Sequence, residues 1–227
     1  MKLSSFSNKS FVLYYVPSIN RWRSLNLSYS LEILPSLLHG AVTTLEVFAL
    51  VLIFSIPLGI LIAFAMQLKW KPLNWLIHIY IWVMRGTPLL LQLIFIYYVL
   101  PSVGIRLDRL PAALIAFTLN YAAYFAEIFR GGIDTIPKGQ YEAAKVLKFT
   151  PGATIRYIVL PQVTKIVLPS VFNEIMSLVK DTSLVYVLAM NDILRITKSI
   201  VQRDFDISAF LVAAIFYLIF TFILTNI

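Results

Sequence analysis

Cysteine is absent from the 227 residues, and charged side chains make up only 13% of them. Without cysteine the chain forms no disulfide and carries out no thiol chemistry. A soluble domain usually has about a quarter of its residues charged, whereas 59% of this chain is hydrophobic. A water-soluble core cannot hide so much apolar surface, so the composition predicts a chain that lies in a lipid bilayer.

Catalytic and cofactor-binding signals are also scarce. Two histidines are too few for a histidine-based metal site, and no G-x-x-x-x-G-K-[ST] loop is present to cradle nucleotide phosphates. No nucleophile–base pair or metal constellation stands out, which disfavours an intramembrane enzyme. We therefore expect no cofactor or metal in this chain and no ATP hydrolysis by it.

Apolar segments dominate what is present. A spanning helix needs about 20 mostly apolar residues, and the pattern predicts an all-α membrane protein with five transmembrane helices. The predicted spans are residues 47–68, 73–100, 110–126, 166–191 and 207–227. Residues 1–38 are expected to form an N-terminal tail, and residues 39–227 the transmembrane domain. The last apolar run has no polar anchor, which predicts that a C-terminal tail is missing.

The second span is interrupted by Arg85, Gly86, Thr87 and Pro88, and Gln92 follows on the same helical face as Arg85. An arginine at membrane depth normally faces a cavity or a partner. Two interpretations remain open: Arg85 lines a cavity, or the span starts late and Arg85 reaches the headgroups.

Polar stripes mark the third and fourth spans. Asn120 and Glu127 lie seven residues apart on one face, as do Asn173 and Lys180. Lys180 is adjacent to Asp181, and neighbouring side chains on a helix diverge by about 100°. Each charge therefore needs another partner. The stripes indicate a path for a zwitterionic ligand, or else interhelical hydrogen bonds and a structural ion-pair network.

A polar, basic stretch separates the third and fourth spans. Residues 138–147 are predicted to form a short helix, and Thr150 followed by Pro151 is typical of the start of a second one. Two short helices that meet at a bend form a knob suited to contact a partner in the aqueous phase. The connections that would share its side hold eight basic residues and the opposite connections five. The four basic residues of the N-terminal tail nearly cancel this bias, so charge alone leaves the orientation open.

The motifs resemble those of permease subunits of ABC importers, in the polar amino-acid branch (histidine, glutamine, glutamate, arginine and cystine type). The resemblance covers roughly residue 43 to the C-terminus. It is carried by Glu142-Ala143-Ala144 with Ile158-x-Leu160-Pro161, by Arg85-Gly86-Thr87-Pro88-Leu89-Leu90, by Asn120-Tyr121-Ala122-Ala123-Tyr124 with Glu127-Ile128-Phe129-Arg130-Gly131-Gly132-Ile133, and by Lys180-Asp181-Thr182-Ser183-Leu184.

This resemblance implies the type I importer permease fold, with a cytoplasmic two-helix coupling loop at about residues 134–161. It implies a pairing with a second permease subunit, the same or homologous, and a separate cytosolic ATPase dimer that holds ATP and magnesium. An extracytoplasmic binding protein would deliver the amino acid. The chain would lie in the bacterial cytoplasmic membrane with its N-terminus outside and its coupling loop and C-terminus inside.

The resemblance also assigns roles to residues. Coupling to the ATPase would involve Gly139, Glu142, Ala143, Ala144, Lys148, Leu160 and Pro161. The candidates for the substrate path are polar residues of the predicted spans: Arg85, Thr87, Gln92, Asn120, Glu127, Asn173, Lys180 and Asp181. Lys148 departs from the family pattern, which has glycine there to end the helix in a left-handed turn. The alternative function is a stand-alone channel or ion-coupled carrier that uses the same intramembrane charges.

Overall fold

The computed structural model of the protein describes residues 27–226, and every regular element in that range is helical. The predicted all-α class is confirmed. The α-helices are α1 (Leu27–Met66), α2 (Lys71–Gly86), α3 (Leu89–Ile94), α4 (Arg109–Asp134), α5 (Lys138–Val146), α6 (Pro151–Thr154), α7 (Leu160–Asp181), α8 (Ile193–Asp204) and α9 (Ser208–Thr225). Short π- and 3₁₀-helical turns extend α3, join α6 to α7 and follow α7: η1 (Phe95–Val99), η2 (Leu100–Val103), η3 (Ile155–Val159) and η4 (Thr182–Leu188).

Residues 27–226 contain four to five candidate membrane spans. Four stretches are long and apolar enough to cross a bilayer, namely α1, α4, the continuous stretch Pro151–Leu188, and α9. A fifth is formed if α2 and Leu89–Val103, which are bent by 105° at a short break, count as one span. The interruption predicted in the second span is therefore confirmed, and the bend is sharp.

α1 is longer than predicted, because it begins at Leu27 and not near residue 47. Its first turns pack against α8 and α9 through Tyr29, Ile33 and Leu37. The polar residues before position 47 lie within the helix and do not mark its start. The Thr44 hydroxyl, for example, donates to the Gly40 carbonyl one turn earlier at 3.1 Å. The boundary predicted at residue 38 falls inside α1, and the rest of the predicted tail lies outside the described residues.

The polar connection predicted at residues 192–206 is instead a helix, α8. The Asp192 side chain caps it by accepting hydrogen bonds from the backbone N–H groups of Leu194 (3.0 Å) and Arg195 (3.1 Å). Ile193 and Ile200 lie on its buried face. Asp192 is a strong N-cap residue. The helix was nevertheless overlooked, because it is too short and too polar to span the membrane.

The second of the two predicted short helices is not separate from the fourth span. Thr150 caps α6 as predicted, by accepting from the Ala153 N–H at 3.2 Å, and the helix then runs on through η3 into α7. The π-helical turn η3 ends two residues before Pro161, and η1 ends two residues before Pro101. Proline has no N–H to donate and its ring crowds the carbonyl four residues back, so the preceding turn widens.

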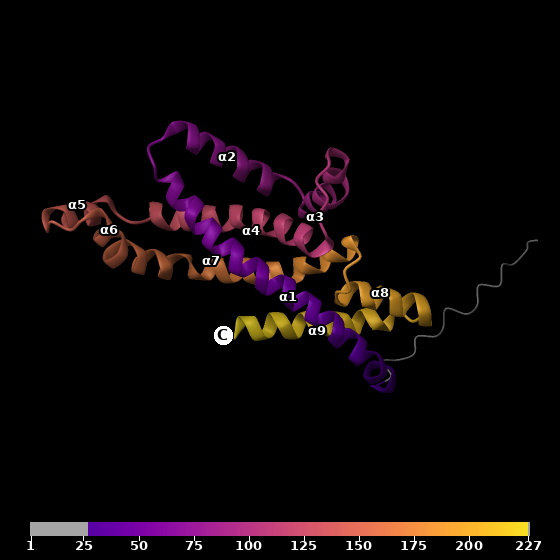
Figure 1. The fold of residues 1–227 in the computed structure, drawn as a ribbon. Coiled ribbons are helices and arrows are strands. Elements are labelled where there is room, and N and C mark those ends of the chain that lie inside the picture. Colours follow the sequence, from indigo (N-terminus) through magenta and orange to yellow (C-terminus); the bar gives the residue numbers. More distant parts are fainter. Residues whose placement is uncertain (1–26, 227) are drawn as a thin grey trace, which may run out of the picture.

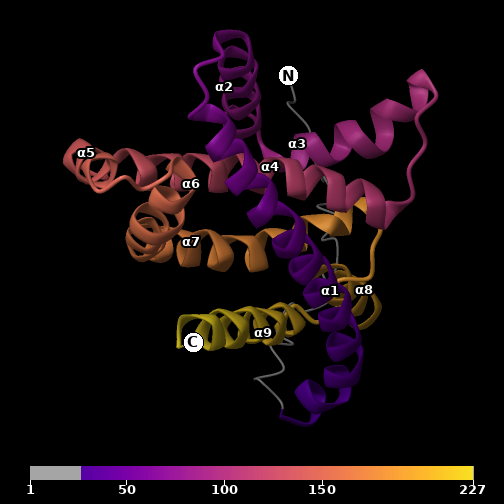
Figure 2. The same cartoon turned by 60° about the vertical axis from the view of Figure 1, so that its left-hand side comes forward.

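Close helix contacts centre on α4 (Figure 1). A Cβ atom on Gly59 of α1 would lie 2.6 Å from the Cβ of Phe125 on α4, and one on Gly132 would lie 2.3 Å from a methyl of Val167 on α7. Both glycines therefore permit the close approach of helices that small residues allow in membranes. In Figures 1 and 2, α5 and α8 lie at opposite ends of the molecule.

Candidate functional site

A polar cavity of about 650 Å³ lies where the α2–α3 break faces α4 and α7. Its lining carries charges of both signs, with one guanidinium and two carboxylates. The polar residues that line it are Arg85, Thr87, Asn120, Tyr121, Tyr124, Glu174, Ser177 and Asp181.

The local sequence explains the break that opens this cavity. Thr87 is extended (φ −119°, ψ 144°), as expected for a residue before proline, so α2 ends there and α3 starts afresh after Pro88. The carbonyls left unpaired at the end of α2 are bonded by side chains. Thr87 donates to the Val83 carbonyl at 2.8 Å, and the Gln92 amide donates to the Met84 carbonyl at 3.0 Å.

Asn120 ties α4 to the same break. Its amide donates to the Met84 carbonyl at 2.9 Å and to the Gln92 side-chain oxygen at 3.1 Å. Asn120 is almost fully buried, so these bonds satisfy an amide group that would be costly to leave unpaired. Gln92 does not line the cavity; it supports the wall from behind.

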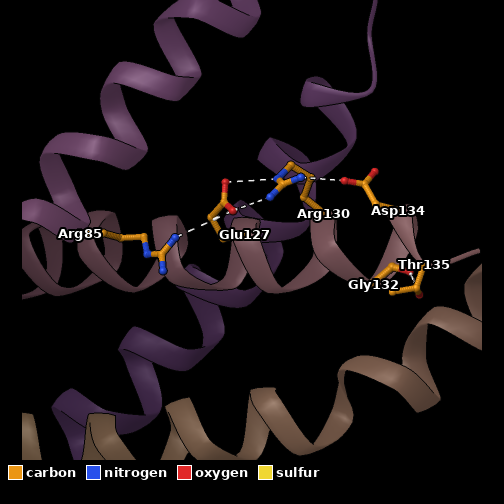
Figure 3. A network of polar contacts seen from close by, with 6 residues as sticks. All are labelled: Arg85, Glu127, Arg130, Gly132, Asp134 and Thr135. Carbon is orange, nitrogen blue, oxygen red and sulfur yellow. Dashed lines mark hydrogen bonds and ion pairs between the residues drawn. The ribbon is translucent and has the colours of Figure 1, made fainter.

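A row of alternating charges leads from the cavity along α4 (Figure 3). Arg85 lies 3.9 Å from Glu127 and over the ring of Tyr124, at 5.2 Å from its centroid. Glu127 is bound at 2.8 Å by Arg130, which also binds Asp134 at 2.7 Å. Glu127 therefore holds two arginines and does not line the cavity.

The α7 wall carries Glu174, Ser177 and Asp181, spaced three and four residues apart on one face. Asp181 accepts a hydrogen bond of 2.7 Å from the Tyr121 hydroxyl. Asn173 and Lys180 are exposed and do not line the cavity. Among residues 27–226 no ion pair joins Lys180 or Asp181 to Glu127 or Glu174, so the ion-pair network considered from the sequence does not form.

The predicted coupling loop, residues 134–161, lies at the α5 end of the molecule (Figure 1). Ala144 is buried, whereas Gly139, Glu142 and Ala143 are exposed on α5. Lys148 adopts the left-handed conformation (φ 56°). The Phe149 N–H donates to the Ala144 carbonyl at 2.9 Å, and the Lys148 N–H donates to the Lys145 carbonyl at 3.0 Å. These two bonds form the Schellman pattern that ends a helix. Leu160 and Pro161 are exposed at the start of α7.

Comparison with known proteins identifies the chain. Residues 55–227 match the family described as "Binding-protein-dependent transport system inner membrane component". The chain belongs to this family. It is the inner-membrane permease subunit of a binding-protein-dependent amino-acid ABC transport system. Hydrolysis of ATP belongs to a separate subunit, and permease subunits of this kind carry no cofactor, so the stand-alone carrier is set aside.

Several relatives resemble the permease over most of its length. The L-cystine transport system permease protein TcyB of Bacillus subtilis (strain 168) is 37% identical over 193 residues, which is 84% of this chain and 82% of the relative. The arginine transport system permease protein ArtQ of the same organism is 34% identical, over 88% of this chain and 94% of the relative. A crystal structure of an amino acid ABC transporter with histidines matches with a TM-score of 0.81 and 31% identity, over 88% of this chain and 94% of that one.

The structure groups the predicted path residues of the permease unevenly. Arg85, Thr87, Asn120 and Asp181 line the cavity, whereas Gln92 and Glu127 support it and the remaining two lie elsewhere. The predicted path omitted four polar lining residues: Tyr121, Tyr124, Glu174 and Ser177. The spacing of Glu174, Ser177 and Asp181 on one helical face was the signal that could have found three members of the wall together.

Proposed function

We propose that the cavity at the α2–α3 break holds the transported amino acid during import. The observation that carries this proposal is the presence of both charge signs around one cavity: Arg85 faces it with Glu174 and Asp181. An amino acid carries a carboxylate, which a guanidinium binds strongly, and an ammonium group, which a carboxylate binds. The volume of about 650 Å³ lies within the usual range of small-molecule sites.

We further propose that α5 docks on the ATPase. Val146 is 81% exposed and Leu147 is 69% exposed at its end, and two apolar side chains held in water mark an interaction surface. The left-handed turn at Lys148 fixes the direction in which the chain leaves α5. Glu142, exposed on the same helix, supplies a charge for a specific contact.

The partners and orientation follow from this docking. We place the coupling loop and the C-terminus inside the cell and the N-terminus outside, which makes the α8 end extracytoplasmic. There an amino-acid-binding protein would deliver substrate, and a second permease subunit, the same or homologous, would complete the path. Two permease subunits that rock against each other as the ATPases close would open the cavity to alternate sides.

Affinity purification of the tagged permease, extracted in mild detergent from its own organism, tests the docking. We expect a cytosolic ATPase to co-purify with the wild type and to be lost or depleted with Glu142→Arg. Glu32→Arg, at an exposed carboxylate of α1 near the other end, is the matched control and should retain the ATPase. Equal retention by Glu142→Arg would contradict the role of α5, and the co-purifying permease would show whether the pair is identical.

The cavity is tested separately. Arg85→Gln removes the guanidinium that binds the carboxylate common to all amino acids. We expect the affinity of the purified permease–ATPase complex for every transported amino acid to fall at least tenfold, which corresponds to about 1.4 kcal/mol, while the ATPase stays bound. Unchanged affinity would remove the cavity from the substrate path.

A further inference from the structure

We propose that Tyr98 and Arg109 are positioning residues for transport, which together hold the cavity closed on the side of α8. Both side chains reach across the fold to one short segment. The Tyr98 hydroxyl, from η1, donates to the backbone carbonyl of Val187 at 2.9 Å. The Arg109 guanidinium, from the start of α4, donates to the backbone carbonyl of Ala189 at 3.3 Å. These two hydrogen bonds form a clasp, and its proposed role rests on the proposed function of the cavity.

The clasped segment links the cavity wall to α8. η4 follows α7 directly after Asp181 and contributes Leu184 to the lining of the cavity. Residues 189–192 then lead into α8, which begins at Ile193. A displacement of η4 away from α3 and α4 would therefore remove part of the cavity wall and open the cavity on the side of α8.

α8 is fixed to a different part of the fold from η4. Ile193 packs with the first turns of α1 and with α9, and the Tyr29 hydroxyl of α1 donates to Asp204 at the end of α8 at 3.1 Å. η4 instead buries Val185 and Leu188 in the core that includes α3 and α4. Such apolar contacts are non-directional, so the two hydrogen bonds of the clasp fix the position of the segment between the two parts.

The junction between η4 and α8 contains a strained residue. Ala189 has a φ of 56°, in the left-handed region that residues with a Cβ atom disfavour. Strain of this kind persists where the surrounding structure holds it, and it gathers in segments that switch. The bond from Arg109 to the Ala189 carbonyl helps to hold this turn. Tyr98 and Arg109 are both exposed, so water can replace either bond and the clasp can be released reversibly.

Thiol labelling in membrane vesicles that contain the complete transporter tests the clasp. The permease has no cysteine, so Ser177→Cys, on the α7 wall of the cavity, introduces its only thiol. A membrane-impermeant maleimide is added to right-side-out and to inside-out vesicles. The vesicles in which Ser199→Cys, exposed on α8, reacts define the α8 face, so the test does not depend on the orientation of the chain.

We expect Tyr98→Phe and Arg109→Ala each to speed the labelling of the cavity thiol from the α8 face at least threefold, and the double variant to exceed both. Labelling from the opposite face should not rise, because the clasp holds one side only. Tyr97→Phe removes a neighbouring hydroxyl and Arg106→Ala an exposed arginine of the same connection. These two variants are the matched controls and should leave the labelling rate unchanged.

The outcomes separate the clasp from the proposed function. Equal labelling rates in the clasp variants and in the controls would overturn the clasp. An equal rise from both faces would indicate a loosened fold and would overturn it as well. The role of the cavity in substrate binding is measured separately by Arg85→Gln, so unchanged affinity in that variant would remove the substrate site while an increase from the α8 face alone would still show that the clasp closes the cavity.

Discussion

The backbone conformation of Lys148 sets the direction in which the chain leaves α5. Its φ of 56° lies in the left-handed region, which costs a residue with a Cβ atom about 1 kcal/mol and costs glycine little. We expect Lys148→Gly to raise the thermal midpoint of the purified permease. Intrinsic fluorescence of its four tryptophans is the measurement. Lys148→Ala removes the same charge without relieving the backbone, so an equal rise in both variants would contradict the explanation.

The buried carboxyl group of Asp192 should make the stability of the permease depend on pH. Burial raises its pKa from 3.8 to about 6, although the backbone N–H groups that it caps act in the opposite direction. A folded-state pKa above the unfolded one gives stability that is fully present below pH 3.8 and is lost as the pH rises through about 6. The loss is on the order of 3 kcal/mol.

The test is the thermal midpoint of the permease between pH 4 and pH 7.5. We expect the midpoint of the wild type to fall over the range of pH 4 to 6 and the midpoint of Asp192→Asn to change less, because asparagine does not ionise. Asparagine also caps helices well. If the two curves run parallel, the buried carboxylate is not the group that titrates.

Contacts between elements depend on glycine where backbones meet. A Cβ atom on Gly40 of α1 would lie 2.9 Å from backbone atoms of Asp192 and Ile193 at the start of α8. Because backbone cannot move aside as a flexible side chain can, Gly40→Ala should push α1 away from α8 and destabilise the permease by about 1–3 kcal/mol. Gly131→Ala on α4, where a Cβ would meet nothing within 4 Å, is the control and should not destabilise.

Thermal unfolding of both variants measures this difference. A Gly40→Ala midpoint equal to that of the wild type would show that the two helices separate at little cost. The comparison is internal, since both substitutions add one methyl group and both relieve glycine of its entropy cost in a helix.

Elements were predictable where local chemistry decides them. Arg85, Gly86 and Pro88 together disfavour an uninterrupted apolar helix at that point, and Thr150 with Pro151 starts one, so both features were read from the sequence. The extent of α1 was not, because Thr44 and its polar neighbours resemble a helix boundary until their hydrogen bonds are known. α8 was missed although its signal is local, because Asp192 caps it and Ile193, Ile196 and Ile200 recur at helical spacing, while the prediction considered only helices long enough to span the membrane.

The site was predictable only in part for a related reason. Arg85 and Asp181 were selected because charges in apolar segments are costly, but the rotation of each helix decides which charges face one cavity. The bond from Tyr121 to Asp181 joins residues 60 apart in sequence. The binding of Glu127 by Arg130, in contrast, spans three residues and could have been found from spacing alone.

At the scale of the whole molecule, charge counting leaves open which end faces the cytoplasm. α5 and α8 lie at opposite ends (Figures 1 and 2), so the side on which either end lies fixes the side of the other. The absence of cysteine makes this testable, because one introduced cysteine is the only thiol. Lys69, in the turn between α1 and α2, and Ser199, on α8, are both exposed and suit such a substitution.

In intact cells we expect a membrane-impermeant maleimide to label Ser199→Cys, and to label Lys69→Cys only after the membrane is permeabilised. The physical reason is that the reagent reaches only thiols in the outer aqueous phase, and an α5 that binds a cytosolic ATPase requires α8 outside. The cysteine-free wild type controls for background. The reverse labelling pattern would place α5 outside, where no ATP is available, and docking of α5 on a cytosolic ATPase would then be physically impossible.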